Sequence, residues 1–182
     1  KELLNKEGIN NVSVRKTRGR LSDHYDPRSR TLNLSQEVYH GNSIASIGVA
    51  AHEAGHAIQH AVQYTPLSLR HTLVPVASFG SRFGPMLAVF GFFFLRSEFL
   101  VTLGLIFFTG AVLFQIITLP VEFNASSRAL RLLQKHNFLN RQEAKGTKKV
   151  LNAAALTYVA ATLVAIGHLI RLLVMRGMLD DE

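Results

Sequence analysis

The sequence predicts a mainly α-helical membrane protein that carries a small β-hairpin and about three transmembrane helices. Hydrophobic residues make up 48% of the 182 residues, yet 18% of the residues are charged. The mean hydropathy of +0.18 is high for a chain with that many charges. Apolar and charged residues therefore lie in separate stretches. One stretch, residues 99–119, contains no charge, and its length matches the roughly 20 residues that a transmembrane helix needs.

The residue pattern in the N-terminal part of the chain predicts a β-hairpin. Within residues 21–34, Asp26 and Pro27 supply a turn, and the period-two pattern that follows is typical of a strand. We expect this strand at the edge of a sheet, where an extended peptide substrate can pair with it. A plain hairpin that covers the next helix is the open alternative. The residues of the expected edge strand are Thr31, Leu32, Asn33 and Leu34.

The next helix, which Asn42 or Ser43 caps, contains the motif His-Glu-Ala-Gly-His. Its two histidines, His52 and His56, are four residues apart and therefore lie on one face of the helix. Two neutral imidazoles suit Zn²⁺, and Glu53 can accept a proton from a zinc-activated water. The alternative interpretation is a pair of surface histidines without a metal.

A catalytic zinc site needs a third protein ligand. His60 continues the same helix face, but eight residues of helix span about 12 Å, which is too far for one ion to bridge. A histidine at position 62 would complete another common arrangement of ligands, but that residue is Val62. Glu122, which follows the long apolar stretch, is the outstanding candidate.

The predicted membrane topology agrees with this choice. Residues 73–119 contain two apolar stretches joined by the polar residues 96–98, which predicts a transmembrane hairpin. Two crossings return the chain to its starting side, so His52 and Glu122 lie on the same side of the membrane. A third apolar stretch, residues 150–176, predicts one further transmembrane helix.

The formal net charge of +8 is concentrated on that side of the membrane. By the positive-inside rule, the catalytic side therefore faces the cytoplasm. Basic residues are not interleaved with exposed aromatic residues, so we expect anionic lipid rather than nucleic acid as the partner of this charge. The chain has no cysteine, which excludes disulfides and thiolate metal sites. The basic residues are Arg128, Arg131, Lys135, Arg141, Lys145, Lys148 and Lys149.

Four blocks of the sequence resemble the bacterial YugP-type neutral zinc metallopeptidases. The blocks occur in the same order as in that family, and the resemblance covers nearly the whole chain. The resemblance implies a zincin-like, membrane-bound gluzincin of HtpX-like design, located in the bacterial inner (cell) membrane as a multi-pass protein. Family members begin with another transmembrane helix, so we expect one to precede Lys1. The four blocks are residues 23–29, 47–60, 119–127 and 151–160.

The resemblance also implies roles for individual residues. It makes His52, His56 and Glu122 the zinc ligands and Glu53 the catalytic base. In HtpX-like enzymes an aspartate follows the metal-binding glutamate by four residues, whereas this chain has Ser126 at that position. A supporting role there falls to Ser126 or to its neighbour Asn124.

We therefore expect a zinc-dependent endopeptidase that acts on polypeptide substrates, alone or with an accessory membrane protein or oligomeric partner. The alternative is a non-catalytic membrane scaffold or chaperone partner that retains a structural zinc. The candidates for stabilising the oxyanion or supporting the metal ligands are Tyr158, Arg128, His60 and Asn124.

The expected order of segments follows from these assignments. It is a cytoplasmic zincin-like region with the motif helix (1–72), a transmembrane hairpin (73–119), cytoplasmic helices with the third ligand (120–149), a transmembrane helix (150–176) and an acidic tail (177–182).

Overall fold

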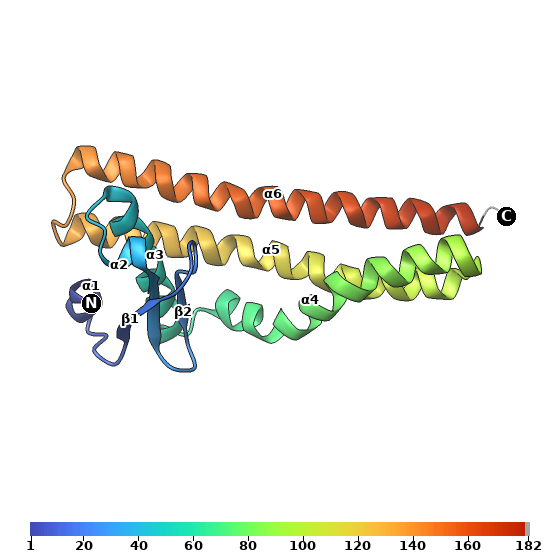
Figure 1. Cartoon of the computed structure of the whole chain (residues 1–182), viewed down its shortest axis with the longest axis horizontal. Coiled ribbons are helices and arrows are strands. Elements are labelled where there is room, and N and C mark those ends of the chain that lie inside the picture. The colour runs from blue at the N-terminus through green and yellow to red at the C-terminus, as the bar shows by residue number, and fades with distance from the viewer. Residues whose placement is uncertain (181–182) are drawn as a thin grey trace. The chain divides into compact units, whose positions relative to one another are not determined.

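The computed structural model describes residues 1–180, so the end of the predicted acidic tail, at 181–182, lies outside the described residues. The fold is mainly helical with one small sheet, as predicted (Figure 1). The elements are, in order, α1 (Glu2–Lys6), β1 (Ser13–Thr17), β2 (His24–Asp26), β3 (Thr31–Ser35), α2 (Gln36–Tyr39), α3 (Ile44–Ala61), α4 (Thr65–Phe90), the π-helical segment η1 (Gly91–Leu95), α5 (Glu98–Lys135) and α6 (Arg141–Asp180).

The chain divides into two compact units. One consists of residues Lys1–Leu67 and Val121–Leu156, and the other of residues Ser68–Pro120 and the chain from Thr157 on. The long helices α5 and α6 each contribute to both units. Each helix is continuous where we expected the membrane boundary, and Pro120 lies inside α5. Neither expected boundary of the segment 120–149 coincides with the end of a helix. The positions at which the helices enter and leave the membrane therefore stay predictions.

The sheet of the first unit confirms the hairpin but corrects its edge. β2 and β3 pair antiparallel around a turn in which Asp26 Oδ1 accepts a hydrogen bond from the backbone N–H of Arg28 (2.9 Å). β1 pairs with the other side of β3 in parallel, so the strand order is β1-β3-β2. The prediction that Thr31–Leu34 form an edge strand is therefore wrong, because both sides of β3 are already hydrogen-bonded. The open edges belong to β1 and β2.

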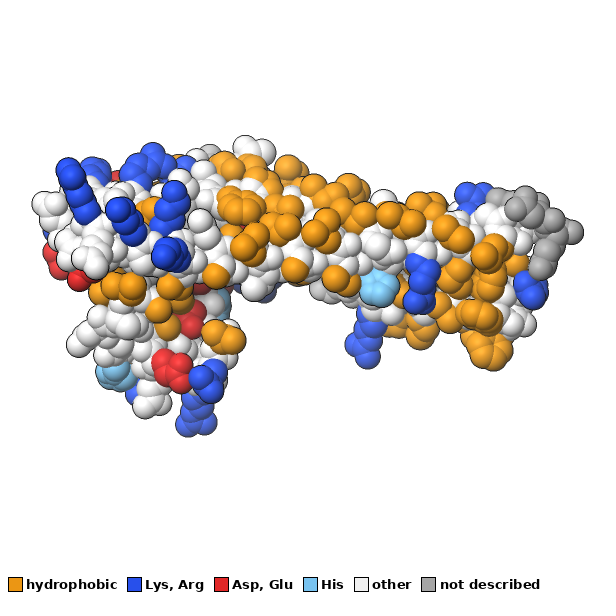
Figure 2. All heavy atoms as spheres, turned by 90° about the horizontal axis from the view of Figure 1, so that it is seen from above, with side chains coloured by type: hydrophobic (Ala, Val, Ile, Leu, Met, Phe, Trp, Pro, Cys, Tyr) orange, Lys and Arg blue, Asp and Glu red, His pale blue; other side chains and the backbone are white. Residues whose placement is uncertain are grey.

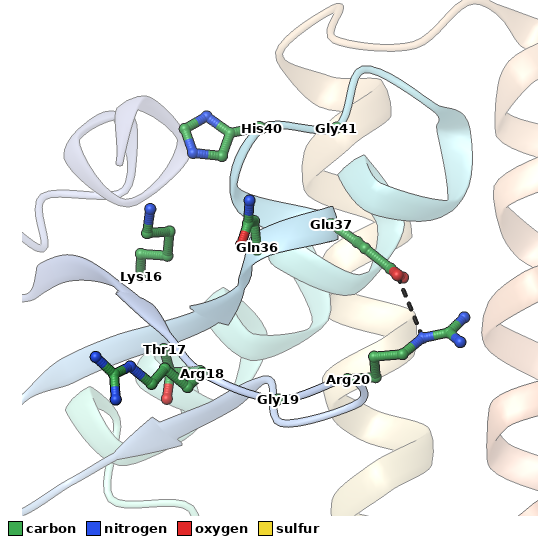
Figure 3. A pocket seen from close by; sticks show the side chains of 9 residues that line it. All are labelled: Lys16, Thr17, Arg18, Gly19, Arg20, Gln36, Glu37, His40 and Gly41. Carbon is green, nitrogen blue, oxygen red and sulfur yellow. Dashed lines mark ion pairs between the residues drawn. The ribbon is translucent and has the colours of Figure 1, made fainter.

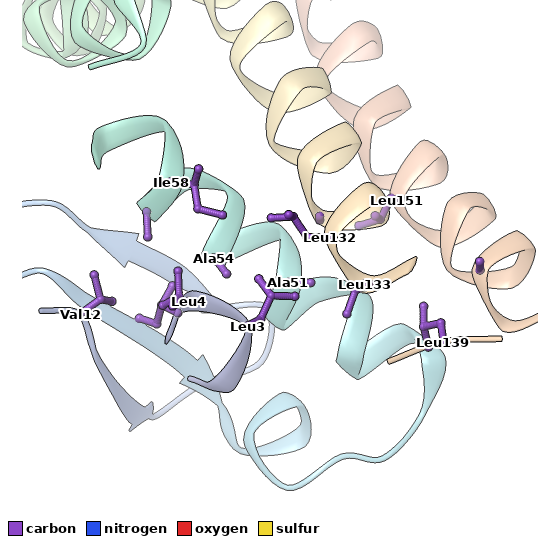
Figure 4. Packing of buried hydrophobic residues seen from close by; sticks show 14 residues of the cluster. Leu3, Leu4, Val12, Ala51, Ala54, Ile58, Leu132, Leu133, Leu139 and Leu151 are labelled. Atoms are coloured by element: carbon purple, nitrogen blue, oxygen red, sulfur yellow. The ribbon is translucent and has the colours of Figure 1, made fainter. Parts of the chain in front are cut away.

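The core of this unit lies between the sheet, α1, α3 and the parts of α5 and α6 that belong to the unit (Figure 4). Leu4 and Leu32 are almost fully buried in it. Small residues on α3, such as Ala54 and Ala57, allow close packing against Ala129 of α5. Ser43 caps α3, as expected, because its Oγ accepts a hydrogen bond from the backbone N–H of Ser46 (3.1 Å).

The second unit consists of apolar helices. Three helices of the described chain are long and apolar enough to cross a membrane, which confirms the predicted number. Large hydrophobic side chains such as Phe99 and Leu163 are exposed along them, and Figure 2 shows hydrophobic side chains over the surface of these helices. An ion pair between Arg176 and Glu98 (3.0 Å) joins α6 to the start of α5. Such surfaces are typical of helices that face lipid.

Candidate metal centre

Two histidines of α3 and one glutamate of α5 meet in the first unit. His52 Nε2 lies 3.1 Å from Glu122 Oε2, and His56 Nε2 lies 3.7 Å from the same oxygen. The possible ligand atoms of the three residues all lie within 4.8 Å of one another. Glu122 and His56 are buried, with 2% and 8% of their surface exposed, and His52 is half-buried. Glu122 thus joins two histidines that lie 70 and 66 positions earlier in the chain, and the three residues form one cluster of donors.

This cluster fits a zinc ion by donor type and by spacing. Zinc in catalytic sites takes histidine nitrogens and carboxylate oxygens at about 2.0–2.2 Å, so the ligand atoms of a tetrahedral site lie about 3.3 Å apart. The two nitrogen–oxygen distances, 3.1 and 3.7 Å, are close to that spacing. Three protein donors also leave a fourth position open, which is the arrangement of catalytic rather than structural zinc.

The electrostatics of the cluster are those of a carboxylate beside two imidazoles. Burial lowers the pKa of His56, but the nearby carboxylate of Glu122 and the charge of Glu53 outweigh burial and raise this pKa above its ordinary value. Glu53 itself is buried, with 8% of its surface exposed, and it precedes the cluster's second histidine on the same helix. A second carboxylate therefore accompanies the donor cluster without being one of its members.

Ser126 supports His52 from the opposite side of the ring. Its Oγ lies 3.0 Å from His52 Nδ1, while His52 Nε2 faces Glu122. Glu122 and Ser126 are four residues apart on α5 and therefore share one face of that helix. The position where HtpX-like enzymes carry aspartate thus still holds a hydrogen-bonding partner, and it contacts a metal-ligand candidate.

The remaining candidate residues have different environments. Asn124 and Arg128 are hydrogen-bonded to each other (2.7 Å) close to the cluster. His60 does not contribute to the cluster: its Nδ1 is 2.9 Å from the hydroxyl of Tyr25, which ties β2 to α3. Tyr158 belongs to the second compact unit, so its suggested role stays a prediction.

Sequence reasoning missed one residue, Gln59, which is fully buried and hydrogen-bonded to His56. Its position three residues after His56, on the same face of α3, was the only indication in the sequence. Its other partners lie on α5, far away in the chain, so local patterns could not reveal them.

A wide hollow of the first unit lies apart from the ligand candidates. It has a volume of about 1120 Å³ and lies between the end of β1 and α2 (Figure 3). Its lining is polar and basic, and one of its arginines, Arg20, pairs with Glu37 (3.2 Å). His52, His56 and Glu122 do not line this hollow. The candidate metal centre therefore lies at the contact between α3 and α5 and is separate from this hollow.

Comparisons with known proteins agree with the donor cluster. Residues 1–177 match the model of a family described as "Putative neutral zinc metallopeptidase". The chain is also 50% identical over 171 residues to a protein of Bacillus subtilis (strain 168) named "Putative membrane protease YugP", a match that covers 94% of this chain and 76% of that protein. No solved structure matches the chain.

Proposed function

Because the chain belongs to the family of neutral zinc metallopeptidases, we propose that it is a membrane-embedded zinc endopeptidase of the gluzincin type. The observation that carries this proposal is the meeting of His52, His56 and Glu122 within 4.8 Å in a largely buried place. These three residues would hold the ion. Glu53, next to His52 on α3, is the general base.

The chemistry divides between the ion and the chain. When bound, zinc acts as a Lewis acid that polarises the scissile carbonyl and makes water more acidic. Glu53 accepts a proton from the attacking water and then delivers it to the leaving amine. Its burial supports this role, because exclusion of bulk water strengthens electrostatic interactions with the reacting groups. His52 and His56 serve only as neutral ligands and transfer no proton in the reaction.

The substrate would lie extended along the open edge of β2. This strand is short, but it is tied to α3 by the hydrogen bond between Tyr25 and His60. Its free edge can add a peptide strand by backbone hydrogen bonds, which do not depend on the side chains of the substrate. β2 thus takes the place of β3, which was expected to have this role but is paired on both sides.

The catalytic side faces the cytoplasm of a bacterial inner membrane in this proposal, because seven basic residues, from Arg128 to Lys149, follow the third ligand candidate in the chain. The natural absence of cysteine makes this testable with single introduced cysteines. One variant, Ser97→Cys, places a cysteine in the link that precedes α5. The other, Asn11→Cys, places a cysteine at an exposed position of the first unit. In intact cells, a membrane-impermeant maleimide should label the Ser97→Cys variant but not the Asn11→Cys variant. The Asn11→Cys variant should be labelled only after the cells are lysed. The reverse pattern would refute the orientation.

The decisive test of the function compares the wild type with Glu53→Gln in detergent-purified protein. Zinc content and cleavage of casein are measured on the same samples. We expect equal zinc in both, with cleavage only in the wild type, because glutamine cannot accept the proton. Glu2→Gln, an exposed change of the same kind, should leave cleavage unaltered. Cleavage by Glu53→Gln at the wild-type rate would contradict the role of Glu53, and absence of cleavage in all variants would favour the scaffold.

A further inference from the structure

Gln59 is a polar side chain with no exposed surface, and it lies beside the metal centre at the end of α3. Its Oε1 is 2.9 Å from His56 Nδ1, and its Nε2 is 2.8 Å from the carbonyl oxygen of Val121. We propose that Gln59 is a positioning residue that fixes the tautomer and the ring orientation of His56, so that the free electron pair of Nε2 points to the metal. This inference deepens the proposed function and rests on it.

The orientation of the Gln59 amide follows from its partners. The carbonyl oxygen of Val121 can only accept a hydrogen bond, so the atom of Gln59 that faces it must be the nitrogen. A second partner leads independently to the same result. Gln59 Nε2 also lies 3.0 Å from Asn124 Oδ1, and that atom accepts a hydrogen bond from Arg128 Nε, which can only donate. Both hydrogens of the Gln59 amide are thus donated to oxygens of α5.

The tautomer of His56 follows in turn. With the nitrogen of Gln59 facing α5, its oxygen faces His56 Nδ1, and an oxygen of this kind only accepts. Nδ1 of His56 must therefore carry the hydrogen. A neutral imidazole has only one N–H, so Nε2 holds the free electron pair, and Nε2 is the atom that lies 3.7 Å from Glu122 Oε2. This chain of donors and acceptors starts at Arg128 and ends at the metal-binding nitrogen.

His52 is supported in a different way. Its Nδ1 faces the hydroxyl of Ser126, which can either donate or accept. Ser126 therefore holds the ring of His52 in place but leaves its tautomer open. The two candidate ligand histidines thus differ in whether a partner fixes their tautomer. Replacing Gln59, the partner of His56, should therefore weaken zinc binding more than replacing Ser126, the partner of His52. Loss of such partners typically lowers metal affinity 10- to 100-fold.

The test measures zinc affinity, by competition with a chelator, in the detergent-purified full chain. Gln59→Met keeps the length of the side chain but has no hydrogen-bonding amide, and we expect its zinc Kd to rise about 10- to 100-fold. Gln134→Met, the same change at an exposed position of α5, should leave the Kd unchanged. Ser126→Ala should raise the Kd less than Gln59→Met does.

Two further measurements separate positioning from general stability. The visible spectrum of the Co²⁺-loaded protein reports ligand geometry, and we expect it to differ between Gln59→Met and the wild type. If Gln59→Met does not fold, Asn124→Leu and Asn124→Asp replace it, because only the aspartate keeps an oxygen for Gln59 and Arg128. The leucine variant should then bind zinc more weakly than the aspartate variant.

A zinc Kd for Gln59→Met within twofold of the wild type, with an unchanged cobalt spectrum, would overturn the proposal. So would equal zinc affinity of the two Asn124 variants. Failure of the proposed function is distinguishable, because neither measurement requires cleavage. A wild type that binds zinc but cleaves no peptide refutes the endopeptidase alone, whereas a wild type without zinc affinity refutes both.

Discussion

Gly55 of α3 lies directly against the backbone of Ala125 of α5. A Cβ atom added to Gly55 would be 2.6 Å from the carbonyl oxygen of Ala125 and 3.2 Å from its Cα. Those atoms are backbone, so they cannot swing aside as the end of a flexible side chain could. The helix with the two histidines and the helix with Glu122 therefore touch where Gly55, which lies between the histidines, meets Ala125, three residues after Glu122. We expect this contact to set the distance between the histidines and Glu122.

Gly55→Ala should consequently separate the two helices. Alanine normally stabilises a helix relative to glycine by about 1 kcal/mol. Here we expect the opposite sign, a loss of roughly 1–3 kcal/mol, because overpacking forces the backbone to shift. Zinc content should fall as well, since Glu122 moves away from His52 and His56. Thermal unfolding and metal analysis of the purified variant would measure both effects.

Gly167→Ala is the matched control for this prediction. It lies within α6, and a Cβ added there meets nothing within 4 Å. It should leave zinc content unchanged and stability unchanged or slightly higher. Equal behaviour of the two variants would show that the contact between Gly55 and Ala125 does not set the geometry of the site.

The meeting of His52, His56 and Glu122 could be predicted from the sequence, because it depends on the local geometry of one helix and on the number of membrane crossings. The four-residue spacing of His52 and His56 follows from helix geometry alone. Glu122 is the carboxylate that follows the long apolar stretch, and a hairpin of two crossings, which returns the chain to the side where it began, agrees with this choice. The turn at Asp26 was equally local, since turn residues favour the same geometry wherever they occur.

The missed features depend on contacts between distant segments. β1 pairs in parallel with β3, and nothing within either strand encodes that partner. The sequence alone therefore predicts an edge strand where the structure has the central strand. Gln59 is recognisable as a partner of His56 only once α5 supplies Val121 and Asn124. A polar residue near the end of a helix otherwise resembles any solvent-exposed glutamine.

The contact between Glu7 and the end of α5 should make stability depend on pH. The carboxylate of Glu7 accepts hydrogen bonds from Lys135 Nζ (2.8 Å) and His136 Nε2 (2.7 Å), and these bonds lower the pKa of Glu7 below its ordinary value. A carboxyl group whose pKa is lowered on folding stabilises the fold above its unfolded pKa of about 4.3. That contribution is lost as the pH falls through the lower, folded pKa.

Glu7→Gln should therefore lower stability at pH 7 by less than about 1 kcal/mol, because the contact is near the surface. The difference from the wild type should shrink steadily as the pH falls below about 4. Urea unfolding at a series of pH values, in the presence of a chelator, would measure it. A difference that stays constant down to the lowest pH would show that the charge of Glu7 is not responsible.

Gly104 has a corresponding role in the second unit. A Cβ added to it would be 2.7 Å from the backbone nitrogen of Ala88 on α4, and one added to Gly84 would be 2.8 Å from the carbonyl oxygen of Gly104. Close packing of small residues is a main source of helix association in membranes. Gly104→Ala should lower the unfolding temperature in detergent, whereas Gly177→Ala, with nothing within 4 Å, should not. Equal unfolding temperatures would contradict this packing.

Glu122→Ala should remove most of the zinc. The substitution leaves two histidines four residues apart, and catalytic zinc sites use three protein ligands. Zinc that binds only the folded state raises its stability, so the wild type should unfold at a lower temperature once a chelator is added. Glu122→Ala should already unfold at a temperature that the chelator does not change. Glu37→Ala, at an exposed carboxylate, should keep the full response to the chelator. Full zinc content in Glu122→Ala would mean that another residue supplies the third ligand, and the assignment of α5 to the metal centre would then be wrong.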